Sequence, residues 1–179
     1  MNDTLSLSLT QIIKKAPSTA PVKKRFLKKV KEGALTRDQN NESHVCVYFL
    51  PINRKEKKVF FVNHKKAGTW ISPGGHIEKN ELPKQAVIRE FSEELGYNIS
   101  KNQPLQPFLL TIVDIENTKR RCKTHFDIWF TVDTPINAFT VDTKEFFETK
   151  WMSIEEAKKL TKDKNNKTAL SAVEKTIFL

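Results

Sequence analysis

The chain has 179 residues, of which 38% are hydrophobic and 29% charged, and its formal net charge is +10. This length suits one domain with a sizeable core and room for an extension, and the positive charge fits either a nucleic-acid or a polyphosphate partner. No apolar run approaches a membrane span, and the N-terminal residues lack the apolar core of a signal peptide, so we expect a cytoplasmic protein that contacts no membrane.

The first 40 residues carry helical patterns rather than strand patterns. Residues 9–15 predict a short helix that Pro17 stops. Residues 22–33 predict an amphipathic helix ended by Gly33. Its apolar face repeats at four-residue spacing and comprises Val22, Phe26 and Val30, with Leu27 beside them.

The opposite face of this second helix is strongly basic. It holds Lys23, Lys24, Arg25, Lys28, Lys29 and Lys31. No aromatic side chains are interleaved to stack on bases, so a solvated face is favoured, and a basic patch that binds RNA, DNA or polyphosphate is the alternative. We therefore expect a basic helical extension at residues 1–40 and a separate domain at residues 41–179.

Three β-forming runs follow a polar segment, residues 35–43, that reads as a linker. The runs are residues 44–50, 59–64 and 69–72, with turns predicted at 51–58 and 65–68. The third run leads into a loop that contains Gly74 and Gly75. Cys46 and Cys122, the two cysteines, lie in strand-like runs without C-x-x-C spacing. This favours reduced thiols over a disulfide or a metal site.

A helix is predicted from Pro83 to the residue before Gly96, which can adopt the left-handed conformation that ends a helix. One face is apolar and predicts burial against a sheet, with Ala86, Val87, Phe91 and Leu95. At roughly 100° per residue, Glu90, Glu93 and Glu94 share the other face. Three carboxylates on one helical turn repel each other unless a cation lies between them, and Mg²⁺ prefers such oxygen ligands.

The C-terminal half predicts a long hairpin of residues 105–116 and 121–133 around a turn at 117–120. A further strand lies within residues 145–152. Ser153 and Glu156 form the S-x-x-E pattern of a capping box, so a helix is expected from there to Leu160. After the polar residues 162–167, an apolar stripe of Leu170, Val173 and Ile177 predicts a terminal helix.

The stretch from Gly75 to Tyr97 resembles the box of the Nudix hydrolase family. The matching positions are Gly75, Glu81, Arg89, Glu90, Phe91, Glu93, Glu94, Gly96 and Tyr97. Residues 68–78, 124–130 and 145–157 also resemble segments of this family. The likeness spans residues 44–160 and implies an α/β fold, an α/β/α sandwich around a mixed sheet.

The resemblance implies a Mg²⁺-dependent hydrolase, with Mn²⁺ as a substitute ion, that cleaves a nucleoside diphosphate linked to another group. By family likeness, Glu90, Glu93, Glu94 and the Gly75 carbonyl are metal ligands, and one of these glutamates or a later one activates water. Arg89 would orient a carboxylate and Glu81 would hold the loop. Glu145 and Glu148 are candidates for an additional base or ligand, although each also fits a surface charge at a strand end.

Four residues are candidates for substrate binding, and each has a structural alternative. His76 would contact phosphate or hold its loop. His125 and Asp127 would line the pocket or form a local polar pair, and Trp70 would stack on a base or lie in the core.

Two other functions remain open. An isopentenyl-diphosphate-type isomerase shares the fold but needs a cysteine in the pocket, and a non-catalytic nucleotide- or RNA-binding module would not need the glutamates. The expected partner is a small nucleotide, with the protein a monomer or a homodimer, and the sequence does not identify the substrate.

Overall fold

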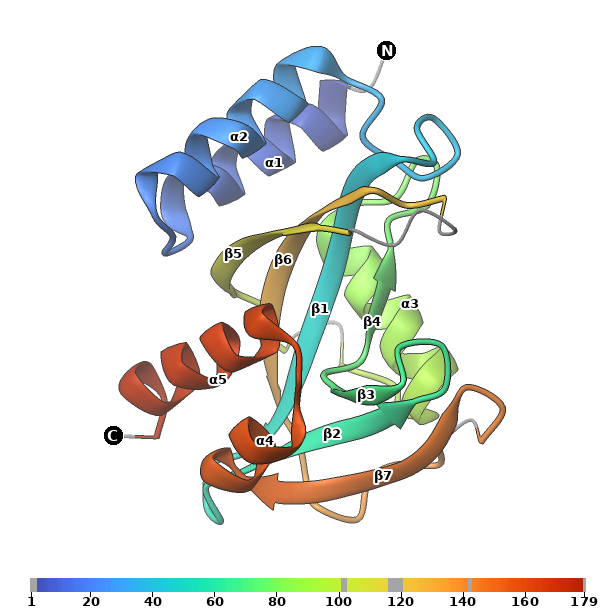
Figure 1. Ribbon diagram of the computed structural model, residues 1–179, viewed down its shortest axis with the longest axis vertical. Coiled ribbons are helices and arrows are strands. Elements are labelled where there is room, and N and C mark those ends of the chain that lie inside the picture. Colours follow the sequence, from blue (N-terminus) through green and yellow to red (C-terminus); the bar gives the residue numbers. More distant parts are fainter. Residues whose placement is uncertain (1–2, 101–102, 116–120, 142, 179) are drawn as a thin grey trace.

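A seven-stranded sheet with helices on both faces forms the described part of the chain, residues 3–100, 103–115, 121–141 and 143–178 of a computed structural model (Figure 1). The helices are α1 (Asp3–Lys15), α2 (Ala20–Glu32), α3 (Pro83–Leu95), α4 (Ile154–Leu160) and α5 (Lys164–Thr176). The strands are β1 (Ser43–Asn53), β2 (Lys58–His64), β3 (Thr69–Ile71), β4 (Gly74–His76), β5 (Pro107–Asp114), β6 (Thr124–Asp133) and β7 (Phe146–Ser153).

The sheet is mixed, as predicted. Its order is β3-β2-β1-β6-β5, with β4 paired to β1 and β7 paired to β2. β1 and β6 run parallel, and the other pairs are antiparallel. The predicted hairpin is confirmed as β5 and β6, whereas its turn at 117–120 lies outside the described residues.

Two features of the sheet differ from the sequence prediction. β1 continues through Pro51 to Asn53, where a turn was expected, because its parallel pairing with β6 extends to Ile52 and outweighs the turn preference of proline. The predicted loop at Gly74 and Gly75 forms β4, which pairs with β1. Glycine has a low strand propensity, so only the tertiary pairing with β1 makes this segment a strand.

Alternation along β1 divides the core into two layers. Val45, Val47 and Phe49 lie in the cluster that α1, α2 and α3 cover. Leu50 and Ile52 lie in a second cluster that α4 and α5 cover. Successive residues of a strand point to opposite faces, so helices on both sides are required to bury β1. This arrangement confirms the predicted α/β/α sandwich.

The N-terminal helices α1 and α2 pack directly on the sheet, although the sequence predicted a separate extension joined by a linker. Phe26 of α2 packs edge-on against Phe126 of β6, with ring centroids 5.2 Å apart. Arg25 donates two hydrogen bonds, of 3.0 and 2.8 Å, to the Asp114 carboxylate of β5. Whether residues 1–40 form a separate unit stays a prediction, but α1 and α2 share one core cluster with the sheet.

Three predictions for this region are wrong in detail. Lys29 is 4% exposed rather than part of the solvated basic face, and Leu27, expected on the apolar face, is 46% exposed. The predicted linker holds Leu35 and Thr36, which are both buried, and their backbone N–H groups donate to the Gln39 side chain. Residues 35–43 were predicted to be a linker because they are polar, but the Gln39 side chain holds the start of this segment in a fixed loop.

The C-terminal helices follow their caps. Ser153 accepts a hydrogen bond from the Glu156 backbone N–H at 3.1 Å, which confirms the predicted N-cap of α4. Asp163 caps α5 in the same way, so this helix begins within the polar residues expected to interrupt it. Among the described residues, the helices are too short or too polar to cross a membrane.

Candidate active site

The predicted helix α3 is confirmed, and local chemistry defines both ends. At the N-terminus the Gln85 side chain accepts a 2.8 Å hydrogen bond from the Leu82 backbone N–H. Gly96 ends the helix at φ 60°. Phe91 is fully buried and packs on Phe49 at 4.8 Å between ring centroids. That burial contributes about 2–3 kcal/mol and fixes which face of α3 turns away from the core.

Arg89 organises the polar face of α3. Its Nε and Nη2 atoms donate to the two carboxylate oxygens of Glu81 at 2.9 and 3.0 Å, which is a bidentate pair. Its Nη1 donates to Glu90 at 2.9 Å and to Glu93 at 3.1 Å. One guanidinium therefore holds three carboxylates, and this strongly raises the Arg89 pKa through the Glu81 hydrogen bonds first.

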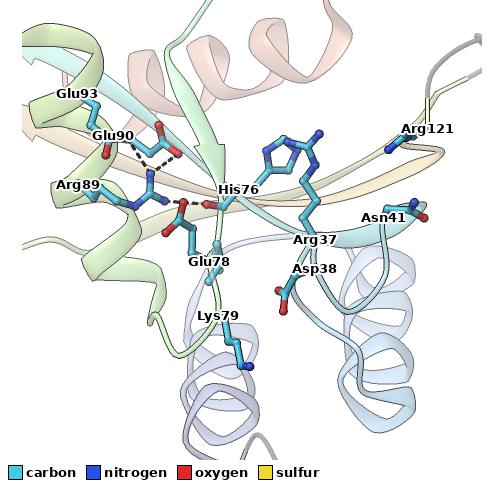
Figure 2. A pocket seen from close by; sticks show the side chains of 11 residues that line it. Arg37, Asp38, Asn41, His76, Glu78, Lys79, Arg89, Glu90, Glu93 and Arg121 are labelled. Carbon is cyan, nitrogen blue, oxygen red and sulfur yellow. Dashed lines mark hydrogen bonds and ion pairs between the residues drawn. The ribbon is translucent and has the colours of Figure 1, made fainter.

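The same side chain ties the loop before α3 to β4. Arg89 Nη2 donates to the His76 carbonyl oxygen at 3.0 Å (Figure 2). The Glu81 carboxylate also accepts a hydrogen bond from the Glu78 backbone N–H at 2.9 Å. These contacts are the positioning interactions that the sequence suggested for Arg89 and Glu81, whereas their roles in a reaction stay predictions.

The three glutamates of α3 differ in exposure. The Glu90 side chain is 14% exposed and that of Glu93 is 60% exposed, whereas Glu94 is buried at 7%. Glu94 accepts a 3.1 Å hydrogen bond from the Gly74 backbone N–H. Burial raises the pKa of Glu90, and burial followed by the charges of Glu90 and Glu145 raises the pKa of Glu94 well above its usual range.

These residues fit a divalent cation. Buried carboxylates of like charge have raised pKa values because their charged forms lack compensation, and a cation would supply it. A Cβ atom at Gly75 would overlap the Glu90 carboxylate, so the glycine lets the β4 backbone approach this acid. All donors on this side are oxygens, the ligands that Mg²⁺ prefers. Glu90, Glu93, Glu94 and the Gly75 carbonyl are the residues that would hold it.

A pocket of about 770 Å³ opens beside this helix (Figure 2). Its lining residues are Arg37, Asp38, Asn41, His76, Ile77, Glu78, Lys79, Arg89, Glu90, Glu93 and Arg121. Glu90 and Glu93 lie at one end of the pocket, and Arg37 and Arg121 lie at the other. The pocket thus has two glutamates at one end and two arginines at the other, where Asp38 lies beside Arg37.

Only one of the four predicted substrate-binding residues lines this pocket, and that is His76. His125 lines a smaller neighbouring pocket of about 170 Å³. Asp127 is fully buried, accepts hydrogen bonds from Thr111 and Asn165 at 3.3 Å each, and has a pKa raised to about 7, mainly by burial. Trp70 packs against the α4 and α5 core cluster. Substrate contacts for these residues stay predictions.

The two additional acidic candidates differ in position. The charge of Glu145 raises the Glu94 pKa, so Glu145 lies near the carboxylates of α3. It also forms an ion pair with Lys66 at 3.2 Å. Glu148 is an exposed residue of β7. Of the two, Glu145 is the one whose charge acts on Glu94, and the role of either residue as an additional ligand or base stays a prediction.

Seven residues of the pocket lining were not among the site residues predicted from the sequence. Arg37, Asp38 and Asn41 come from the supposed linker, Ile77, Glu78 and Lys79 from the loop before α3, and Arg121 from the start of the segment leading to β6. Isolated polar residues in polar runs carry no spacing signal, so only the fold assembles them. Neither cysteine belongs to the described lining of this pocket, where an isomerase of the alternative type would need one.

The structure thus combines a mixed sheet between helical layers with a helix, α3, that presents Glu90, Glu93 and Glu94. One arginine of this helix holds two of these glutamates together with the loop residue Glu81. The protein-family model described as the NUDIX domain matches residues 42–173 of this chain. This chain therefore belongs to the Nudix family, as the motif predicted.

Relatives and solved structures agree with this assignment. The chain is 34% identical over 80 residues to a probable DHNTP pyrophosphohydrolase of Lactococcus lactis subsp. cremoris, a match of 44% of this chain and 48% of that protein. It is 32% identical over 113 residues to an RNA pyrophosphohydrolase of Hydrogenovibrio crunogenus, covering 56% and 68%. The crystal structure of a NUDIX-family hydrolase from Clostridium perfringens superposes with a TM-score of 0.58 at 27% identity, covering 73% and 96%. The chain spans about half the length of the first of these relatives.

Proposed function

We propose that this protein hydrolyses the diphosphate linkage of a nucleoside diphosphate joined to another group, with Mg²⁺ bound by the glutamates of α3. The observation that carries the proposal is the Arg89 network. One guanidinium fixes Glu81, Glu90 and Glu93 at the end of a pocket of about 770 Å³. A solvated acidic helix face would not need this preorganisation.

The charge pattern of the pocket fits an elongated anion. A diphosphate is repelled by Glu90 and Glu93 unless a cation lies between them, and the bound ion would neutralise the diphosphate and polarise the phosphorus that water attacks. Arg37 and Arg121 at the far end suit a second anionic or polar part of the substrate. Phosphate groups are common partners of such arginines because guanidinium hydrogen bonds are bidentate.

The protein's own groups would position and deprotonate the water. Arg89 holds Glu90 and Glu93, and the Gly74 N–H holds Glu94, so these carboxylates need little reorganisation. Glu93 is the most exposed of the three, so solvent reaches its carboxylate. We assign the proton of the attacking water to a Glu93 carboxylate oxygen, with Glu145 as the alternative acceptor.

The substrate class is testable with a panel. It contains dihydroneopterin triphosphate, an oxidised deoxynucleoside triphosphate, ADP-ribose, a dinucleoside polyphosphate and 5′-triphosphorylated RNA, each with and without Mg²⁺ or Mn²⁺. The readout is released phosphate and pyrophosphate, with the Glu93→Gln protein as the blank. We expect metal-dependent turnover of at least one substrate. Turnover of none, or equal turnover by the blank, would refute the proposal.

A further inference from the structure

Three of the four histidines and one of the two cysteines meet on the sheet face opposite α3. The residues are His44 and Cys46 of β1, His76 of β4 and His125 of β6. Their ligand atoms all lie within 4.8 Å of one another. Among the described residues, this is the group of three or more His, Cys, Asp or Glu side chains found close enough together to hold a metal ion. Glu90, Glu93 and Glu94 do not belong to it.

The backbone register fixes this group. His44 pairs with His125 across the parallel β1 and β6 strands, and Cys46 pairs with His76 across β1 and β4. His44 and Cys46 are two residues apart, so they share one face of β1. The imidazole centroids of His44 lie 4.8 Å from His76 and 5.0 Å from His125. Sheet pairing, rather than flexible surface side chains, therefore holds the four donors together.

The surroundings of two imidazoles suit metal binding. The Nδ1 atom of His44 lies 2.8 Å from the Asn40 carbonyl oxygen, which is an acceptor, so Nδ1 carries the proton. Such an outer hydrogen bond is typical of metal-binding histidines. The Nε2 atom of His44 keeps its lone pair and lies 3.9 Å from the Cys122 sulfur. The Nε2 atom of His76 is buried and has no hydrogen-bond partner, a cost that a bound ion would remove.

The neutral imidazole is the form that binds metals, and His44 is fully buried, where a charged ring would be costly. Two positive charges oppose a bound cation, Arg37, which lies beside the His76 ring (Figure 2), and Arg89. A thiolate at Cys46 would offset one unit of positive charge when an ion binds.

We propose that His44, Cys46, His76 and His125 bind one divalent transition-metal ion, with Zn²⁺ as the ion that suits three imidazoles and one thiolate. Zinc takes nitrogen and sulfur ligands at about 2.0–2.1 and 2.3 Å in a tetrahedron. The four donor atoms, which lie within 4.8 Å of one another, would move closer together when the ion binds. Binding forms three metal–nitrogen bonds and one metal–sulfur bond, and the Cys46 thiol proton passes to solvent. The closed ligand set marks a structural site that joins β4 to β1 and β6. The proposal departs from the expectation, drawn from the sequence, that Cys46 is a reduced thiol outside any metal site.

The test is a titration of the full chain with Co²⁺ in the presence of excess Mg²⁺, which saturates oxygen sites. We expect one equivalent to give tetrahedral d–d absorption and a thiolate-to-cobalt charge-transfer band, and one equivalent of Zn²⁺ to remove both. Cys46→Ser and Cys46→Ala should abolish the charge-transfer band. His44→Asn should weaken binding at least about 100-fold, beyond the 10–100-fold typical of outer-shell changes.

Two matched controls come from the same chain. His64→Asn removes the one histidine outside the group, and Cys122→Ser removes the other thiol, which lies 3.9 Å from His44. Both should keep the stoichiometry and the band. Circular dichroism checks the fold of every variant. Absence of the band in the folded wild-type protein, its loss in Cys122→Ser with retention in Cys46→Ser, or equal weakening by His64→Asn would overturn the proposal. The absorption readout does not depend on hydrolysis, so failure of the proposed function would leave this result unaffected.

Discussion

The two faces of β4 present different donors one residue apart. On one face Gly75 lies against the Glu90 carboxylate of α3, within a set of oxygen donors. On the other face His76 meets His44, Cys46 and His125, a set of nitrogen and sulfur donors. Oxygen ligands suit Mg²⁺, and imidazole and thiolate suit transition metals. Strand alternation thus places two different donor sets on neighbouring residues of β4, and His76 also lines the pocket that contains Glu90 and Glu93.

The largest expected effect is a fall in kcat/KM when one carboxylate oxygen donor of α3 is removed. Glu93→Gln keeps the size of the side chain but loses its charge, and loss of several kcal/mol of transition-state stabilisation corresponds to a roughly 10³-fold fall in kcat/KM. Steady-state kinetics on the best panel substrate measure it. Glu155→Gln, at an exposed glutamate of α4, is the matched control and should leave kcat/KM unchanged. The Co²⁺ band should persist in both variants, and its loss in Glu93→Gln would show that the two faces are not separate.

A smaller effect follows from closing the space at Gly75. In Gly75→Ala the new Cβ would displace the Glu90 carboxylate, and a shift of about 1 Å in a positioned group costs roughly 10²-fold in rate. The measurement is kcat at saturating substrate. Gly33→Ala adds a methyl group in open space at the end of α2, at φ 77°, and should cost only about 1–2 kcal/mol of stability without changing kcat. Full activity in Gly75→Ala would contradict the close approach of β4 to Glu90.

The third change tests whether Arg89 stabilises the cluster of carboxylates near α3 when no cation is bound. Arg89→Lys keeps the charge but cannot reproduce the bidentate contact with Glu81 and the bonds to Glu90 and the His76 carbonyl. We expect a loss of about 2 kcal/mol in the free energy of unfolding, measured by urea denaturation in the presence of a chelator. Lys158→Arg, at an exposed pair with Glu174, is the control. An unchanged urea midpoint for Arg89→Lys would mean that the network adds no stability.

The smallest change lies away from both faces of β4. Ser153→Ala removes the side-chain cap of α4 and should cost about 1 kcal/mol of stability, seen as a lower urea midpoint. Neither kcat/KM nor Co²⁺ absorption should change, which gives a baseline for general destabilisation. A fall in activity as large as that of Gly75→Ala would attribute the Gly75 effect to stability rather than to position.

Some parts of this molecule followed from local sequence, and others did not. The ends of α3 and the cap of α4 were predictable from the sequence. Pro83, Gly96 and Ser153 start, end or cap a helix through contacts with residues only a few positions away. β4 and the course of β1 through Pro51 were not, because their hydrogen-bond partners lie far along the chain. Arg37 and Asn41 were missed for the same reason, since a loop that folds back leaves no periodic pattern.

The sequence by itself determined the Nudix family and helix α3 with its three glutamates, because the spacing of residues along one helix also fixes their spacing in space. Tertiary structure alone decided which acids are buried, which arginines face them across the pocket, and that His44, Cys46, His76 and His125 converge. The physical reason is that helix contacts are set by residues three and four apart, whereas sheet contacts are set by register between distant strands.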